Sequence, residues 1–205
     1  IDCARRSGRP LSVELTTTPG QPRFTSIDVL CTVPDGTKCA LAVLDAIHFA
    51  PSEAPEVFIK EYQPVLVGVA GGADTLRNNG YRPQLIVGNP DQMSAEVLKG
   101  GAQVVLPADA DGHASGLERI QDLGIGAMTF PAAGSATDLA LLLVDHHGAA
   151  LIVTAGHAAG IEEFFDRGRS QTNPSTFLTR LKVGEKLVDA KAVATLYRSH
   201  ISGGA

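Results

Sequence analysis

The sequence predicts an α/β fold in which a mainly parallel sheet carries helices on both faces. Short apolar runs of strand length alternate with amphipathic segments at roughly twenty-residue spacing, which is typical of βαβ units. The apolar residues are mostly Ala, Val, Leu and Ile, with 5% aromatic residues and no Trp, and such side chains suit buried parallel strands. Right-handed crossovers between the units then place helices on both faces of the sheet.

Each element follows from local signals along the chain. The clearest strand is residues 64–69, an apolar run that leads into two glycines and a polar helix over 74–79, which Gly80 closes. Residues 40–47 contain good helix formers and are predicted to be helical. Further strands are predicted at 27–33, 84–88, 103–106, 127–130, 150–154 and 186–190, and further helices at 55–62, 94–99, 116–123, 136–146, 162–167 and 175–181, while 192–197 fits either state.

The pattern divides the chain into three segments. Residues 1–26 are rich in Pro and Thr without a sustained period, so we expect an extended lead-in with one edge strand at 12–16. Residues 27–156 carry the repeated strand and helix units of the α/β domain. Residues 157–205 depart from that spacing and are expected to form a C-terminal extension or subdomain.

Charge and cysteine content narrow the functional classes. A formal net charge of −5 argues against a nucleic-acid partner, because phosphate backbones are bound by an excess of Lys and Arg. Cys3, Cys31 and Cys39 are an odd number and cannot form a closed disulfide framework, which favours a reducing, cytoplasmic location. No apolar run reaches the ~18 residues of a membrane span.

A loop with two glycines follows the strand at 64–69, beyond the carboxyl end of the strand, where ligands of open α/β sheets bind. Gly71 and Gly72 would let backbone N–H groups approach an anion at the start of the next helix, with Asp74 close by. A tight strand-to-helix turn explains the same residues equally well.

Two later loops carry candidate metal ligands. Asn89, Asp91 and Gln92 follow the strand at 84–88, and Asp91 is a hard oxygen ligand of the kind that Mg²⁺ prefers. The alternative is an Asn-Pro turn. Thr137 and Asp138 begin the helix at 136–146, where N-capping by the preceding Ser135 is the competing interpretation.

The histidines favour structural roles. His146 and His147 are adjacent at a predicted helix end, where neighbouring side chains diverge by ~100° and do not readily share a metal. We expect them to form a solvated C-terminal cap that interacts with the helix dipole.

Taken together, the three loops resemble those of the thiamin pyrophosphokinase family, whose Asp-Gly-Gly-Ala, Gly-Asp-x-Asp-Ser and Thr-Asp segments follow successive strands. The resemblance implies Mg-ATP as cofactor, thiamin as ligand, transfer of a pyrophosphoryl group, and Asp91 and Asp138 as metal ligands. Ala70 and Asn89 stand where the family has Asp, and Gln92 stands where it has Ser. The family's Gly-Arg-x-Asp-His segment has no counterpart around 159–163.

The chain also resembles, more closely, the SteA-like group of bacterial cell-division proteins, which carry a degenerate domain of this kind. The stretches that carry this resemblance are residues 64–69, 130–134, 175–181 and 186–191. It implies a nucleotide or phosphate binder that acts as an interaction module with a membrane-associated partner, in a parent protein anchored to the membrane. A homodimer is compatible with the sequence, and an active thiamin pyrophosphokinase is the alternative.

Overall fold

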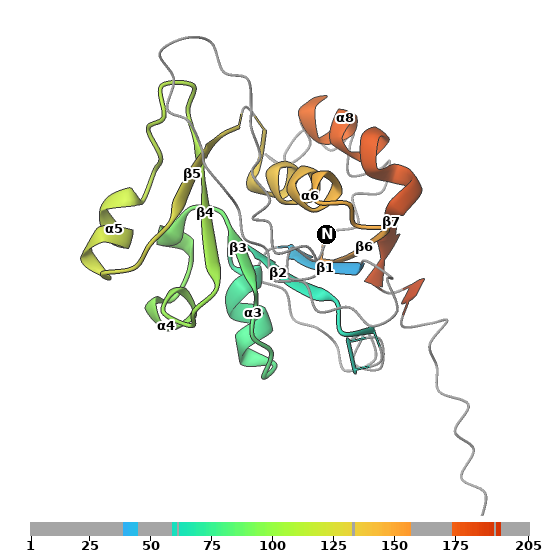
Figure 1. Cartoon of the computed structure of the whole chain (residues 1–205), viewed down its shortest axis with the longest axis horizontal. Helices are drawn as coiled ribbons and strands as arrows, with labels where there is room; N and C mark the ends of the chain where they lie inside the picture. Colours follow the sequence, from blue (N-terminus) through green and yellow to red (C-terminus); the bar gives the residue numbers. More distant parts are fainter. Residues whose placement is uncertain are drawn as a thin grey trace, which may run out of the picture.

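The computed structural model describes residues 39–44, 59–60, 62–132, 134–156, 174–190 and 192–193. Within them, seven strands form one sheet in the order β5-β4-β3-β2-β1-β6-β7, and every neighbouring pair is parallel, which confirms the predicted fold class (Figure 1). The strands are β1 (Cys39–Leu44), β2 (Val65–Val69), β3 (Leu85–Val87), β4 (Gln103–Ala108), β5 (Met128–Pro131), β6 (Leu151–Ala155) and β7 (Leu187–Asp189).

Helices cover both faces of this sheet. Figure 1 shows α6 and α8 above the sheet and α3 and α4 below it. Most of their boundaries fall within two residues of the predicted ones. The helices are α3 (Gly72–Asn78), α4 (Ala95–Leu98), α5 (Leu117–Asp122), α6 (Ala136–His146) and α8 (Pro174–Val183), with short 3₁₀ turns η2 (Pro90–Gln92) and η3 (Gly184–Lys186).

The central strands are apolar throughout because both of their faces are buried. In β2, Val65 and Val67 pack in the cluster that includes α6, whereas Leu66 packs with Leu76 of α3. In β3, Ile86 packs in a third cluster with residues of α4 and α5. Alternate residues of a strand therefore serve opposite layers, as the two-residue side-chain period of a strand requires.

The prediction of a helix at 40–47 was wrong. Residues Cys39–Leu44 are a strand, which pairs in parallel with β2 on one side and β6 on the other. Ala and Leu favour helices by only ~0.5 kcal/mol per residue over typical alternatives, so two hydrogen-bonded ladders outweigh their preference.

Close contact between β2 and α3 depends on one glycine. A Cβ at Gly68 would lie 2.5 Å from the Cα of Ala73, so any side chain there would push the helix away from the sheet. The small residues at both positions therefore let α3 lie directly against β2, and the turn between them becomes short.

The strand order reverses between β1 and β6, because the chain steps outward from β1 to β5 and then returns to the other side of β1. Ligands of open α/β sheets commonly bind at such a reversal, beyond the carboxyl ends of the strands. The segments that follow β1 and β6, residues 45–58 and 157–173, lie outside the described residues.

The described part of the predicted C-terminal extension completes the sheet. Strand β7 pairs with β6, and α8 packs against α6. The strands predicted at 12–16 and 27–33, the lead-in and the helix at 162–167 lie outside the described residues. Within the described part, no helix is long and apolar enough to cross a membrane.

Candidate functional site

The loops after β2 and β3 interlock at the carboxyl edge of the sheet. The backbone N–H of Ala70 donates to the carbonyl of Val87 over 3.0 Å. A Cβ at Gly88 would lie 3.2 Å from the Ala70 nitrogen, so the absence of a side chain permits this contact. Ala70 has φ +48°, a left-handed conformation that costs a residue with a Cβ ~1 kcal/mol. Sequence reasoning noted Ala70 only as a missing carboxylate and gave no sign of its conformation.

The glycine pair begins α3 in a tight turn. Gly71 occupies the N-cap position, Gly72 is the first helical residue, and both are buried. The carbonyl of Gly71 accepts a hydrogen bond of 3.1 Å from the N–H of Thr75. The turn that we offered as the alternative interpretation is therefore present. A role of these glycines in binding an anion stays a prediction.

Asp74 joins α3 to the start of α4. Its Oδ2 accepts from the N–H of Ser94 over 2.9 Å, and its Oδ1 accepts from the Ser94 hydroxyl. The Ser94 Oγ also accepts from the N–H of Val97 over 3.3 Å, and so caps α4. Both oxygens of Asp74 are thus used to fix the relative position of two helices.

The second loop forms a compact 3₁₀ turn. Asn89 Oδ1 accepts from the N–H of Asp91 over 2.9 Å, as expected for an Asn-Pro turn. Gly116, at φ +79°, lies against this turn, where a Cβ would be 2.7 Å from Asn89 Oδ1. Asp91 and Gln92 are exposed, and the Asp91 carboxylate lies 3.9 Å from Nη1 of Arg119 on α5.

Asp138 is buried where the N-termini of α6 and α8 meet. The Ser135 Oγ accepts from the Asp138 N–H over 3.1 Å, and Asp138 Oδ2 accepts in return from the Ser135 N–H over 3.0 Å, which confirms the capping interpretation of Ser135. Thr176 Oγ1 donates to the same Oδ2 over 3.1 Å, whereas Oδ1 has no hydrogen-bond partner among the described residues. Thr137, the next candidate, is half-buried on α6. Sequence reasoning missed Thr176, because it lies 38 residues away and no local pattern links it to Asp138.

The two predicted magnesium ligands belong to different layers. Asp91 contacts Arg119 in the layer of α3, α4 and α5, whereas Asp138 is enclosed between α6 and α8 on the opposite face. Within the described residues, no three His, Cys, Asp or Glu side chains converge as a metal-binding group. These side chains therefore do not fit one shared Mg²⁺ ion in this geometry, and their assignment as metal ligands stays a prediction.

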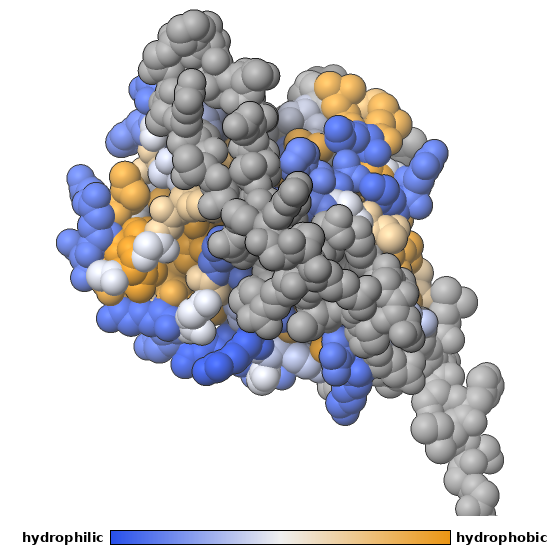
Figure 2. All heavy atoms as spheres, viewed as in Figure 1, coloured by the Kyte–Doolittle hydropathy of each residue, from blue (hydrophilic) through white to orange (hydrophobic). Residues whose placement is uncertain are grey.

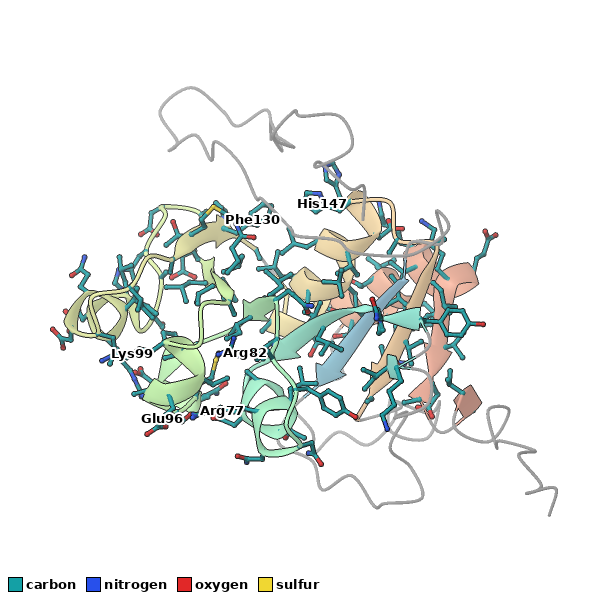
Figure 3. The ribbon with its side chains drawn as sticks, turned by 60° about the horizontal axis from the view of Figure 1, so that its bottom comes forward. Arg77, Arg82, Glu96, Lys99, Phe130 and His147 are labelled. Carbon is teal, nitrogen blue, oxygen red and sulfur yellow. The ribbon has the colours of Figure 1, made fainter. Side chains whose placement is uncertain are left out.

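The histidine pair at the end of α6 differs from the expected solvated cap. His146 is exposed, but His147 is only 3% exposed, and neither of its ring nitrogens has a hydrogen-bond partner. The two rings meet edge to face with centroids 5.5 Å apart, and Figure 3 labels His147 at the end of α6. Burial, with a smaller contribution from His146, lowers the pKa of His147 to about 4. The ring is therefore neutral at pH 7, so it cannot stabilise the helix dipole as a cation.

These features define an open parallel α/β protein whose carboxyl-edge loops are joined by hydrogen bonds and close backbone contacts. No protein-family profile and no curated protein sequence matches the chain. Among solved structures it is similar to thiamin pyrophosphokinase from Geobacillus thermodenitrificans, with 18% identity and a TM-score of 0.42 over 73% of this chain and 58% of that chain. It is also similar to thiamine pyrophosphokinase from Bacillus subtilis, with 14% identity and a TM-score of 0.43 over 74% and 60% of the two chains. A protein from Lactobacillus plantarum is similar at 14% identity and a TM-score of 0.41, over 75% and 59%.

The chain thus spans roughly three fifths of the length of these solved proteins. The identities and TM-scores are low, so we assign the fold from the order and direction of the strands in the sheet. The activity of this chain is proposed in the next section.

Proposed function

We propose that this chain is a thiamin-pyrophosphokinase-like domain that lacks efficient transferase activity, binds a nucleotide or another phosphate compound, and acts as an interaction module in bacterial cell division. The resemblance to the SteA-like group supports the cellular role. The hydrogen bonds that its carboxylates form within the fold support the loss of activity.

The observation that carries the proposal is that two of the three acids of the candidate site, Asp74 and Asp138, form hydrogen bonds within the fold. Asp74 is hydrogen-bonded to Ser94, and Asp138 to Ser135 and Thr176. Pyrophosphoryl transfer depends on neutralising phosphate charge, usually with metal ions held by carboxylates. With Ala70 and Asn89 at two positions where the resembling family has Asp, few acids are left for that task.

The outer face of α8 supports the interaction role. Phe177, Leu178 and Leu181 are 48%, 64% and 64% exposed, and they lie on one side of the helix. Figure 2 shows this hydrophobic patch over α8. Large apolar side chains grouped at a surface commonly mark a site of protein association. The partner that we propose is the membrane-associated cell-division protein implied by the resemblance.

The second candidate function is an active thiamin pyrophosphokinase. It is favoured by Asp138, because this buried carboxylate keeps one oxygen without a hydrogen-bond partner. Such an oxygen is free to accept from a ligand or to contact a cation.

An assay of AMP release from Mg-ATP in the presence of thiamin separates the two candidates. We expect binding of Mg-ATP in a calorimetric titration of the wild-type chain, with turnover far below the ~1 s⁻¹ of ordinary enzymes. Turnover at or above that rate would refute the loss of activity and establish the second candidate. Absence of nucleotide and phosphate binding would refute the binding role.

A double variant, Ala70→Asp with Asn89→Asp, tests the reason for the loss. Asp tolerates the left-handed conformation of position 70 better than most residues, and at position 89 it keeps the Oδ1 acceptor for Asp91. We expect the affinity for Mg-ATP to become more dependent on Mg²⁺. A control with Asn78→Asp and Gln121→Glu adds the same charge at exposed positions of α3 and α5. An equal response in both double variants would contradict the proposal.

The interaction role is tested by co-purification with the membrane-associated cell-division proteins of the source bacterium. Leu178→Ser with Leu181→Ser removes the centre of the α8 patch, and Lys182→Ser is the matched exposed control. We expect the first variant alone to lose the partner. Retention of the same partners by the first variant would show that α8 is not the contact surface.

A further inference from the structure

A hollow of about 660 Å³ opens at the amino edge of the sheet, opposite the carboxyl-edge loops. It is lined by the residues that lead into β3, β4 and β5, and we call it the amino-edge hollow. Among the described residues, its polar side chains are Arg82, Gln84 and Gln103, and no Asp or Glu lines it.

Apolar side chains and glycine backbone form the walls of the amino-edge hollow. Ala102 and Ala127 are partly exposed, pack against the same core cluster and line the hollow, and Figure 2 shows hydrophobic residues at the surface between α5 and β4. A Cβ built at Gly101 or Gly126 meets nothing within 4 Å, so the backbone of both residues faces open space. A ligand can therefore approach the peptide groups here without meeting side chains.

Two residues with hydrogen-bond donors, Arg82 and Gln84, line this space just before β3. Gln84 is fixed because its Oε1 accepts from the N–H of Leu66 over 2.6 Å, so its amide nitrogen is the part left for a ligand. Arg82 lies two residues earlier, lines the same hollow and is exposed. Within the described part of the chain, neither the Arg82 guanidinium nor the Gln84 Nε2 has a partner.

A smaller hollow of about 240 Å³ continues from Arg82 to the ends of α3 and α4. There Arg77 and Glu96 form an exposed pair 3.8 Å apart. Figure 3 shows these side chains with Arg82 and Lys99 on this part of the molecule. The Glu96 carboxylate repels an anion from the smaller hollow, which leaves Arg82 and the amino-edge hollow as the favourable position.

We propose that the amino-edge hollow binds a small organic anion, in which a carboxylate or phosphate group is attached to a compact apolar body. Arg82 and Gln84 offer donors without a competing acid, and guanidinium groups pair with both carboxylates and phosphates through two parallel hydrogen bonds. The apolar body lies against Ala102 and Ala127. This site is separate from the carboxyl edge and does not depend on the function proposed above.

The test is a titration of the full ¹⁵N-labelled chain, followed by the amide resonances of Gly100, Gly101 and Gly126. The probes are phenyl phosphate, benzoate, inorganic phosphate and the uncharged benzyl alcohol. We expect one or both aromatic anions to shift these resonances with a dissociation constant at or below about 1 mM. The two anions distinguish a phosphate from a carboxylate ligand. Equal binding of benzyl alcohol, or no shift with either aromatic anion, would overturn the proposal.

Variants identify the donors. Arg82→Gln should weaken binding by about tenfold, since a charge-assisted hydrogen bond is lost. Gln84→Glu keeps the oxygen that accepts from Leu66 but replaces the donor with a negative charge, so it should weaken binding at least as much. Lys99→Gln is the control, because it removes an equal charge at an exposed position that does not line the amino-edge hollow. An equal loss in Lys99→Gln and Arg82→Gln would show nonspecific attraction and refute the assignment.

Discussion

Replacing His147 by Leu should stabilise the protein and remove part of its sensitivity to acid. The His147 ring is buried at the end of α6, and both nitrogens lack hydrogen-bond partners. A buried polar group without a partner costs ~1–3 kcal/mol, whereas Leu has a similar volume and no polar atom. We therefore expect His147→Leu to raise the free energy of unfolding at pH 7 by ~1 kcal/mol.

The pH dependence follows from proton binding. The pKa of His147 falls from 6.5 to about 4 on folding, mainly through burial. Between these values the unfolded chain binds a proton that the folded chain does not, so stability decreases as pH falls from 7 to 4 and levels off below 4. Each pKa unit corresponds to ~1.4 kcal/mol, which sets an upper limit of ~3.5 kcal/mol for this shift. Screening by nearby water lowers this contribution to ~1–2 kcal/mol.

Urea unfolding followed by circular dichroism between pH 7 and pH 4 measures the effect. The His147→Leu variant should lose less stability over this range than the wild-type chain, by the same ~1–2 kcal/mol. His146→Gln is the control, because His146 is exposed and contributes only a secondary electrostatic effect. If wild type and His147→Leu lose equal stability on acidification, the histidine is not buried in neutral form and the reasoning fails.

Two further predictions concern the packing of α3. Gly68→Ala should lower the free energy of unfolding by ~3 kcal/mol or more, since the new Cβ would lie 2.5 Å from the backbone of Ala73. Gly184→Ala is the control: its new Cβ would meet nothing within 4 Å, so it should change the free energy of unfolding very little in the same urea titration. Asp74→Asn should lower the free energy of unfolding by ~1–2 kcal/mol, because the new amide group places a donor where the carboxylate accepted from the Ser94 donors. A double-mutant cycle with Ser94→Ala should give a coupling energy of ~1 kcal/mol. Independent, additive effects would show that the Asp74–Ser94 contact does not hold the helices together.

Much of the fold follows from periodicity in the sequence. The run at 64–69 and the boundaries of α6 were predicted closely, because the first is buried on both faces and the second has a capping box at Ser135. Strand β1 was missed because its Ala and Leu residues favour a helix locally, and only pairing with β2 and β6 makes it a strand. Those partners are distant in sequence, so no local signal could reveal the pairing.

The candidate site was less predictable than the fold. The sequence indicated which loops carry Asp74, Asp91 and Asp138, but it could not show that each acid has a structural partner in another element. Thr176 for Asp138 and Arg119 for Asp91 are brought there by tertiary packing. The burial of His147 was hidden for the same reason, because adjacent residues at a helix end differ in exposure only once the neighbouring layer is in place.

The carboxyl edge and the amino edge of the sheet offer different hydrogen-bonding groups to a ligand. At the carboxyl edge, the Asp138 carboxylate already accepts from the N-terminus of α6, so a phosphate at that position would have to displace a buried charge. At the amino edge, Arg82 and Gln84 retain donors that no described residue uses. The phosphate site that we propose at the carboxyl edge would therefore need donors from the loops that follow β2 and β3. At the amino edge, the donors line a hollow in which none of the described residues is an Asp or Glu that would repel the anion.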